Sequence, residues 1–191
     1  ACIAHAFYKG YREGSNNVLV YDFGGGTLDV SLVQIKGGNI TVIATAGDSH
    51  CGGADIDQKI FDLVVDKMVK DGYPNIKQPE PEPAEYERCK RLRSVLLQAC
   101  EEAKKNLTVA ETADIILPDV RGDEEYVMKI KKGDIDSIIN DMRDKLIKPI
   151  VTIMSKSSDI NDLILVGGSS RVPSVKDLVE KTLNLKSSKP D

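Results

Sequence analysis

The stretch Val18-Leu19-Val20-Tyr21-Asp22-Phe23-Gly24-Gly25-Gly26-Thr27-Leu28-Asp29-Val30 decides how this chain folds. Its first four residues form an apolar run, as expected for a strand that is buried on both faces. The looser alternation that begins at Leu28 predicts a second strand, paired with the first. The three glycines between the strands carry no Cβ, so the backbone there can adopt positive φ and approach a ligand closely.

The residues around this turn favour a phosphate as the ligand. Successive backbone N–H groups in a tight turn form a concavity that binds anions. Asp22 and Asp29 bracket the turn, and the Thr27 hydroxyl can hydrogen-bond a phosphate oxygen. Mg²⁺ bound to a nucleotide keeps several waters and takes few protein carboxylates. Asp22 and Asp29 are therefore suited to hold the ion through its waters. The turn is not a P-loop, which needs GxxxxGK[ST] before a helix. The alternative is a glycine-rich hairpin whose acids cap the turn.

Length and composition limit the class of protein. At 191 residues the chain holds one large domain or two small ones. Its net charge of −4 argues against nucleic acid or an anionic membrane as the main partner. There is no apolar run of transmembrane length and no secretory signal. The four cysteines show no CxxC pairing, so we expect reduced thiols and a cytoplasmic setting. Because the chain begins without Met, we expect it to be part of a larger protein.

Hydrophobic periodicity predicts strands first and helices afterwards. Three strands joined by tight turns, and therefore antiparallel, are expected over 17–22, 27–36 and 40–46. Helical spacing then predicts helices over 54–71 and about 84–108, separated by a proline-rich loop.

The remaining elements follow from the same patterns. Residues 1–7 are interpreted as the end of a helix, and residues 112–117 and 124–130 as a hairpin. A helix is expected from Gly133 to Lys156, with Pro149 kinking or interrupting it.

A second glycine loop follows another short apolar strand, over 162–166. It reads Gly167-Gly168-Ser169-Ser170-Arg171-Val172-Pro173 and leads into a helix from Ser174 to Leu183. By the same backbone logic it predicts a second point of approach to a phosphate or nucleoside. The alternative is a plain turn between strand and helix. Two such loops in one chain are stronger evidence than either alone.

One helix face carries a polar stripe in the expected helix over 84–108. The spacing i, i+3, i+4, i+7 places four side chains on the same side: Glu101, Lys104, Lys105 and Thr108. From spacing alone, a solvated face with Glu–Lys pairs is the simplest interpretation.

Four motifs in order give the chain a resemblance to the 70-kDa heat-shock chaperones over nearly its whole length. They are DFGGGTLD (22–29), GDSHCGGAD (47–55), ACEEAKKNLT (99–108) and LVGGSSRVP (165–173). The resemblance implies an α/β fold: an actin-like, ribonuclease H-like ATPase lobe with an inserted α+β subdomain, lobe II of the nucleotide-binding domain. It implies a ribonuclease H-like subdomain over 12–52 and 140–191, an inserted subdomain over 53–139, and the end of the connection from a preceding lobe over 1–11.

The resemblance also implies roles for single residues. Asp22 positions the waters around Mg²⁺, and Asp22, Thr27 and Asp29 form the catalytic group. The β- and γ-phosphates are wrapped by Gly24, Gly25, Gly26 and Thr27. The remaining contacts to the nucleotide, most of them to the adenosine, come from Gly53, Glu101, Lys104, Lys105, Thr108, Gly167, Gly168, Ser169 and Arg171.

Two positions depart from the pattern of these chaperones. Lys105 stands where the family commonly has arginine, and a lysine stacks less well on adenine. Ala54 stands where an acidic residue is usual, which removes a carboxylate. Both departures predict weaker or altered nucleotide contacts.

The function that the resemblance implies is that of a chaperone ATPase. ATP hydrolysis in the intact protein would drive binding and release of unfolded polypeptides, with a J-domain co-chaperone and a nucleotide-exchange factor as partners. The first phosphate loop, the catalytic lysine and a catalytic carboxylate are expected before Ala1. The chain alone would then be a monomer with half of the ATP/ADP site and little turnover. The alternatives are a lobe of an actin-like filament protein and, less favoured, a sugar kinase lobe.

Overall fold

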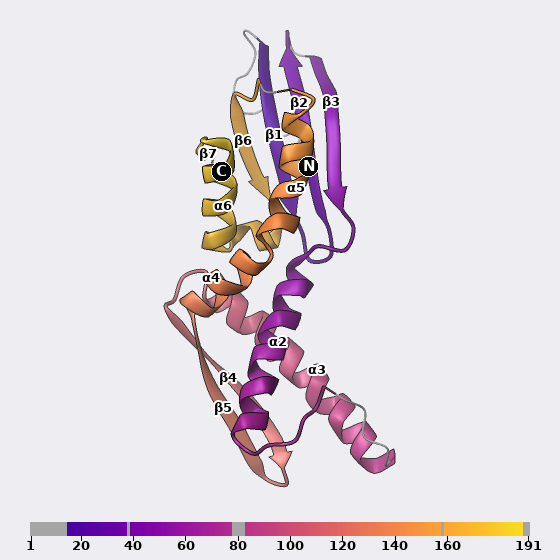
Figure 1. The fold of residues 1–191 in the computed structure, drawn as a ribbon, viewed down its shortest axis with the longest axis vertical. Helices are drawn as coiled ribbons and strands as arrows, with labels where there is room; N and C mark the ends of the chain where they lie inside the picture. Colours follow the sequence, from indigo (N-terminus) through magenta and orange to yellow (C-terminus); the bar gives the residue numbers. More distant parts are fainter. Residues whose placement is uncertain (1–14, 38, 78–82, 158, 189–191) are drawn as a thin grey trace. The chain divides into compact units, whose positions relative to one another are not determined.

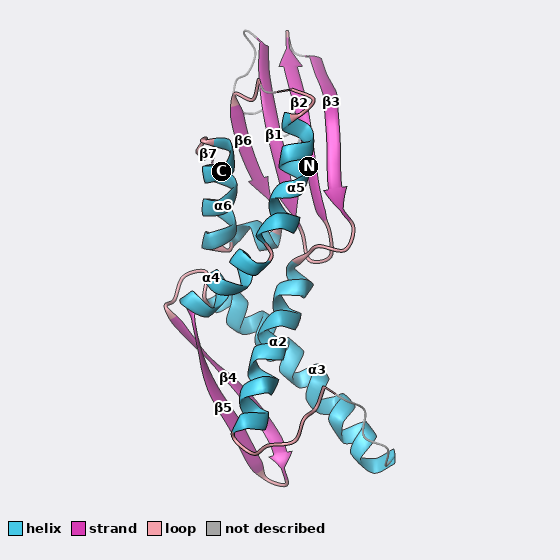
Figure 2. Ribbon diagram, in the orientation of Figure 1, coloured by secondary structure: helices cyan, strands magenta, loops and turns pink. Residues whose placement is uncertain are grey.

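The computed structural model describes residues 15–37, 39–77, 83–157 and 159–188. By its internal contacts the chain divides into two compact units. Unit 1 consists of residues 1–53 and 139–191, and unit 2 of residues 54–138. The expectation for residues 1–7 lies outside the described residues. Figure 2 shows that both units combine helices with strands.

Unit 1 is built on a five-stranded mixed sheet in the order β3-β2-β1-β6-β7 (Figure 1). Three strands form the antiparallel meander that the sequence predicts: β1 (Ser15–Phe23), β2 (Leu28–Lys36) and β3 (Asn39–Asp48). Strand β6 (Asp162–Val166) is parallel to β1, and β7 (Ser187–Ser188) is parallel to β6. The parallel pairing brings the ends of β1 and β6, and so both glycine loops, to the same edge of the sheet.

The sheet is buried on both faces near β1, as its unbroken apolar run predicts. One face gathers a cluster of β-branched side chains: Val18, Val20, Val33, Ile35 and Ile164. On the other face helix α5 (Arg143–Met154) packs against β2 and β3; Figure 1 shows this helix in front of the sheet. The buried Tyr21 hydroxyl donates to the Leu146 carbonyl of α5 at 3.1 Å, which ties β1 to that helix.

Pro149 does not interrupt the helix that contains it, so the predicted interruption was wrong. Helix α5 continues through Pro149, and the break lies earlier, at Met142 (φ −89°, ψ −1°), between α5 and α4 (Lys132–Asp141). Pro149 is on the buried face of α5 with Leu146, Ile150 and Ile153. Packing of that face against the sheet outweighs the one helical hydrogen bond that proline removes.

Helix α6 (Pro173–Leu183) follows the 3₁₀ turn η1 (Gly168–Arg171) and ends in a left-handed residue, Asn184 (φ 52°). Leu185 N donates to Glu180 O at 3.1 Å, the long hydrogen bond that closes many helix ends. The short strand β7, which periodicity did not predict, comes directly after this cap.

Unit 2 contains helix α2 (Gly53–Lys70) from its second residue onward, helix α3 (Pro83–Asn106) and the hairpin of β4 (Thr112–Arg121) and β5 (Glu124–Lys131). Helix α3 packs on β4. It ends at Asn106 rather than at 108, because Thr108 caps it: its hydroxyl donates to Lys105 O at 2.7 Å. No helix in the described ranges is long and apolar enough to cross a membrane.

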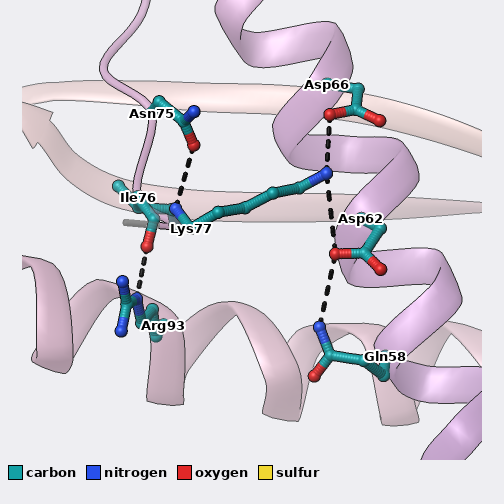
Figure 3. Close-up of polar contacts among 7 residues, drawn as sticks. All are labelled: Gln58, Asp62, Asp66, Asn75, Ile76, Lys77 and Arg93. Atoms are coloured by element: carbon teal, nitrogen blue, oxygen red, sulfur yellow. Dashed lines mark hydrogen bonds and ion pairs between the residues drawn. The ribbon is translucent and has the colours of Figure 1, made fainter. Parts of the chain in front are cut away.

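Polar contacts hold the connection after α2 against both helices (Figure 3). The Lys77 ammonium lies 2.6 Å from Asp66 and 3.6 Å from Asp62, both on α2. From α3, Arg93 Nε donates to the Ile76 carbonyl, and Ile76 itself is fully buried. The proline-rich loop is therefore anchored where it leaves α2.

Glu180 gives a testable prediction about the stability of unit 1. This buried carboxylate accepts hydrogen bonds from Ser187 N (2.9 Å), Ser187 Oγ (2.7 Å) and Lys186 Nζ (2.9 Å). Burial acts to raise its pKa, but these hydrogen bonds outweigh burial and lower the pKa to about 2. A carboxyl with a depressed folded-state pKa stabilises the fold above its unfolded pKa, and the stabilisation disappears as the pH falls towards 2.

We therefore expect Glu180→Gln to lower the free energy of unfolding by about 1–3 kcal/mol at pH 7. The difference from wild type should shrink as the pH falls from about 5 towards 2, measured by urea denaturation of the 191-residue chain. Asp177→Asn, an exposed change on the same helix, is the control and should cost less than about 0.5 kcal/mol. A Glu180→Gln loss that did not change with pH would contradict this account.

Candidate functional site

Three separate segments of unit 1 meet at the backbone of Gly24. The glycine turn is closed by Gly24 N, which donates to Thr27 O at 3.0 Å. The Gly24 carbonyl accepts from Gly53 N at 3.0 Å and from the Ser169 hydroxyl at 2.8 Å. The turn after β1, the start of α2 and the loop after β6 thus form one continuous edge.

The glycines at this edge allow backbone to lie against backbone. A Cβ on Gly52 would lie 2.4 Å from Gly25 O and 2.5 Å from Gly26 Cα. A Cβ on Gly167 would lie 2.3 Å from Phe23 O, and Gly167 also has φ +87°. A side chain at Gly52 would require the glycine turn to move, and one at Gly167 would require the end of β1 to move.

The glycine turn differs from the sequence-based expectation in its backbone conformation. None of its residues Gly24, Gly25 and Gly26 has positive φ. A Cβ on Gly25 or Gly26 would meet no atom within 4 Å, and both residues are exposed. The turn therefore presents bare backbone to open space, which is what a closely bound phosphate requires.

Two carboxylates flank this turn in direct register. Asp22 and Asp29 are opposite one another across the β1–β2 ladder. Thr27 Oγ1 donates to Asp29 Oδ2 at 3.1 Å. Like charges opposite one another destabilise a sheet, so a bound cation would relieve a repulsion that is built into this pair. The described residues contain no group of three or more acidic, histidine or cysteine side chains that could cage a metal. The arrangement fits a hydrated Mg²⁺ better than a directly coordinated ion.

The second glycine loop opens into a cavity of about 590 Å³ in unit 1. Its walls include Gly167, Gly168 and Arg171 from the loop, Lys176 from α6 and Ser187 from β7. Arg171 and Lys176 give this wall positive charge. The volume is in the range of small-molecule pockets.

The polar stripe of α3, in unit 2, is not one exposed face as its spacing predicted. Glu101 and Lys105 are exposed and pair with each other at 2.8 Å. Their hydrogen bond lowers the pKa of Glu101 and raises that of Lys105. Lys104 is buried and pairs with Asp57 of α2, and the Thr108 hydroxyl caps the helix. Only two of the four side chains therefore keep the exposed position that we expected.

Three residues of these regions were not among the predicted site residues. Gly52 and Gly47 lie within the motif GDSHCGGAD, but their close contacts depend on the strand pairing. A Cβ on Gly47 would lie 2.7 Å from Leu28 O and 3.2 Å from Asp29 Oδ1. No sequence signal pointed to Asp57, because it pairs with Lys104 on another helix, 47 positions away in sequence.

The mixed five-stranded sheet with its helices is consistent with an actin-like ATPase lobe. A profile of the family described as "Hsp70 protein" matches residues 1–190, so the chain belongs to the Hsp70 family. Among curated proteins it is similar to "Heat shock cognate 70 kDa protein 3" of Dictyostelium discoideum, with 31% identity over 180 residues. The aligned region covers 92% of this chain but only 27% of that relative.

Proposed function

We propose that this chain is the lobe of an Hsp70-type chaperone ATPase that holds ATP or ADP together with Mg²⁺. The observation that carries the proposal is the meeting of the 24–27, 52–53 and 167–170 segments at the Gly24 carbonyl. It supports a phosphate lying against the bare backbone of Gly24, Gly25 and Gly26, with Thr27 donating a hydrogen bond.

The two units support a division into subdomains. We propose that unit 1 is the ribonuclease H-like subdomain and unit 2 the inserted α+β subdomain. The separate sheets, one of five strands and one of two, support this division. The contact boundaries at 53–54 and 138–139 lie within one residue of the expected ones at 52–53 and 139–140.

The proposal assigns a role to residues of each unit, taken separately. In unit 1, Asp22 and Asp29 would hold the metal ion through its waters. When bound, Mg²⁺ neutralises the phosphate charge that develops during phosphoryl transfer. Contacts to the nucleoside are proposed for Gly53, Gly167, Gly168, Ser169 and Arg171 of unit 1 and for Glu101, Lys104, Lys105 and Thr108 of unit 2.

The activity of the whole protein is part of this proposal. ATP hydrolysis would drive binding and release of unfolded polypeptide, with a J-domain co-chaperone and a nucleotide-exchange factor as partners, in the cytoplasm. The family match does not favour the alternative of an actin-like filament protein.

Calorimetry with MgADP tests the proposal on the 191-residue chain alone. The phosphate-binding residues of this chain lie on one side of the ligand, so we expect weak binding, with a dissociation constant between roughly 100 μM and 1 mM. The matched control is Gly25→Ala, which should weaken binding further without unfolding the chain. Micromolar or tighter affinity would contradict the half-site interpretation, and no heat at millimolar MgADP would contradict nucleotide binding by this lobe.

A further inference from the structure

A buried ion pair between α2 and α3 stands out among the charged groups of unit 2. Lys104 Nζ lies 2.7 Å from Asp57 Oδ2. Only 9% of the Lys104 side chain and 13% of the Asp57 side chain are exposed. The exposed pair Lys105–Glu101 on the same helix shows the ordinary alternative, with exposures of 64% and 49%.

The geometry of this pair is poorly suited to a purely stabilising role. Charges removed from water recover their desolvation cost only when every remaining polar atom is also satisfied. Asp57 Oδ1 is buried and has no hydrogen-bond partner within the described part of the chain. Burial raises the pKa of Asp57, and the hydrogen bond and charge of Lys104 act in the opposite direction. Packed apolar side chains would stabilise this contact between helices at least as well.

Among the charged groups near Asp57, Lys104 is the cation in direct contact with it. The charged groups that influence its pKa are all on α3: Lys104, Glu101 and Lys105. The buried Cys100, also on α3, is influenced by the Asp57 charge in turn. Burial, together with the nearby Asp57 charge, raises the pKa of Cys100 to about 12, so this thiol stays neutral at physiological pH. Lys105 is held by Glu101.

We propose that Asp57 is a positioning residue for the nucleotide, which acts by fixing the Lys104 ammonium of α3 against α2. This rests on the proposed function, in which Lys104 contacts the nucleoside. A free lysine side chain must be immobilised when a ligand binds, and that loss of freedom weakens affinity. A lysine that is already held by a buried carboxylate loses less freedom. Asp57 would therefore strengthen adenosine binding without touching the ligand.

The test compares two ligands in the full-length protein that carries this chain. Dissociation constants of MgADP and of magnesium pyrophosphate are measured by competition with a fluorescent nucleotide. Pyrophosphate has no adenosine, so it does not report on Lys104. We expect Asp57→Asn to weaken MgADP about tenfold and to leave pyrophosphate within about twofold. A loosened fold would weaken both ligands and overturn the proposal.

Two further variants make the role of Lys104 explicit. Lys104→Met should also weaken MgADP about tenfold, and the double variant Asp57→Asn/Lys104→Met should be no weaker than Lys104→Met. Asp57→Glu keeps the charge but displaces the ammonium, so we expect a loss of about threefold, again for MgADP alone. If Asp57→Asn does not fold, the two ligands are compared with Asp57→Glu instead.

The matched control is Asp66→Asn, on the same helix. Asp66 also holds a lysine, Lys77, at 2.6 Å (Figure 3), but on the exposed surface. It should leave both dissociation constants unchanged. If Lys104→Met weakens MgADP while neither Asp57→Asn nor Asp57→Glu does, the positioning role is wrong and the proposed function stands. If Lys104→Met leaves MgADP unchanged, the nucleoside contact of Lys104 is wrong, and the inference fails with it.

Discussion

Replacing Gly52 with alanine is expected to lower nucleotide affinity on the order of a hundredfold and to destabilise the fold by about 1–3 kcal/mol. The new Cβ would lie 2.4 Å from Gly25 O and 2.5 Å from Gly26 Cα, contacts that backbone atoms do not tolerate. The glycine turn must therefore move away from Gly52, and with it the N–H groups proposed to face the phosphates. Urea denaturation and competition binding in the full-length protein measure the two effects.

Gly25→Ala is the matched control for this prediction. Its Cβ would meet no protein atom within 4 Å, so the free energy of unfolding should change by less than about 0.5 kcal/mol. Binding should still weaken, because the methyl group occupies the space proposed for the phosphate. Wild-type stability and affinity in Gly52→Ala would show that this contact does not shape the site.

Asp22→Asn is expected to slow Mg²⁺-dependent ATP turnover of the full-length protein by about ten- to a hundredfold. This corresponds to roughly 1–3 kcal/mol of transition-state stabilisation. The amide keeps the shape of the side chain. It removes the negative charge of Asp22, so that only Asp29 of the pair remains charged. The Mg²⁺ concentration that gives half-maximal rate should rise as well.

Asp136→Asn, an exposed change on α4, serves as the control for turnover and should leave the rate unchanged. Circular dichroism establishes that each variant keeps its fold. If Asp22→Asn turned over saturating ATP at the wild-type rate, Asp22 would have only the turn-capping role that the sequence left open.

Local patterns in the sequence predicted the elements that depend on neighbouring residues. The apolar run at Val18–Tyr21 and the alternation after Leu28 predicted β1 and β2, and the helical spacing from Ile56 to Met68 predicted α2. These signals come from burial on one or both faces of a single element, so they can be read without knowing its partners.

Features that depend on distant partners could not be predicted in this way. Pro149 is tolerated in α5 because the sheet supports that face of the helix. Strand β7 has two residues and depends on β6 and on Glu180, so no periodicity could predict it. Lys104 and Glu101 belong to the same spacing pattern. Only Lys104 is buried, because it pairs with Asp57 of α2.

The same distinction between local signals and distant contacts applies to the candidate site. The glycine motifs were evident from sequence, because bare backbone needs glycine. The close contact of Gly52 with Gly25 and Gly26 was not, because it joins residues that are about 26 positions apart.

The most direct test of nucleotide binding at the glycine turn is a titration of the ¹⁵N-labelled 191-residue chain with MgADP, followed by amide chemical shifts. This measurement detects weak binding and assigns it to residues. The account predicts that the largest shifts occur at Gly24, Gly25, Gly26 and Gly167, whereas Gly72 and Gly122, in turns of unit 2, do not move. Saturating MgADP that left the amides of Gly24, Gly25 and Gly26 unchanged would contradict the account.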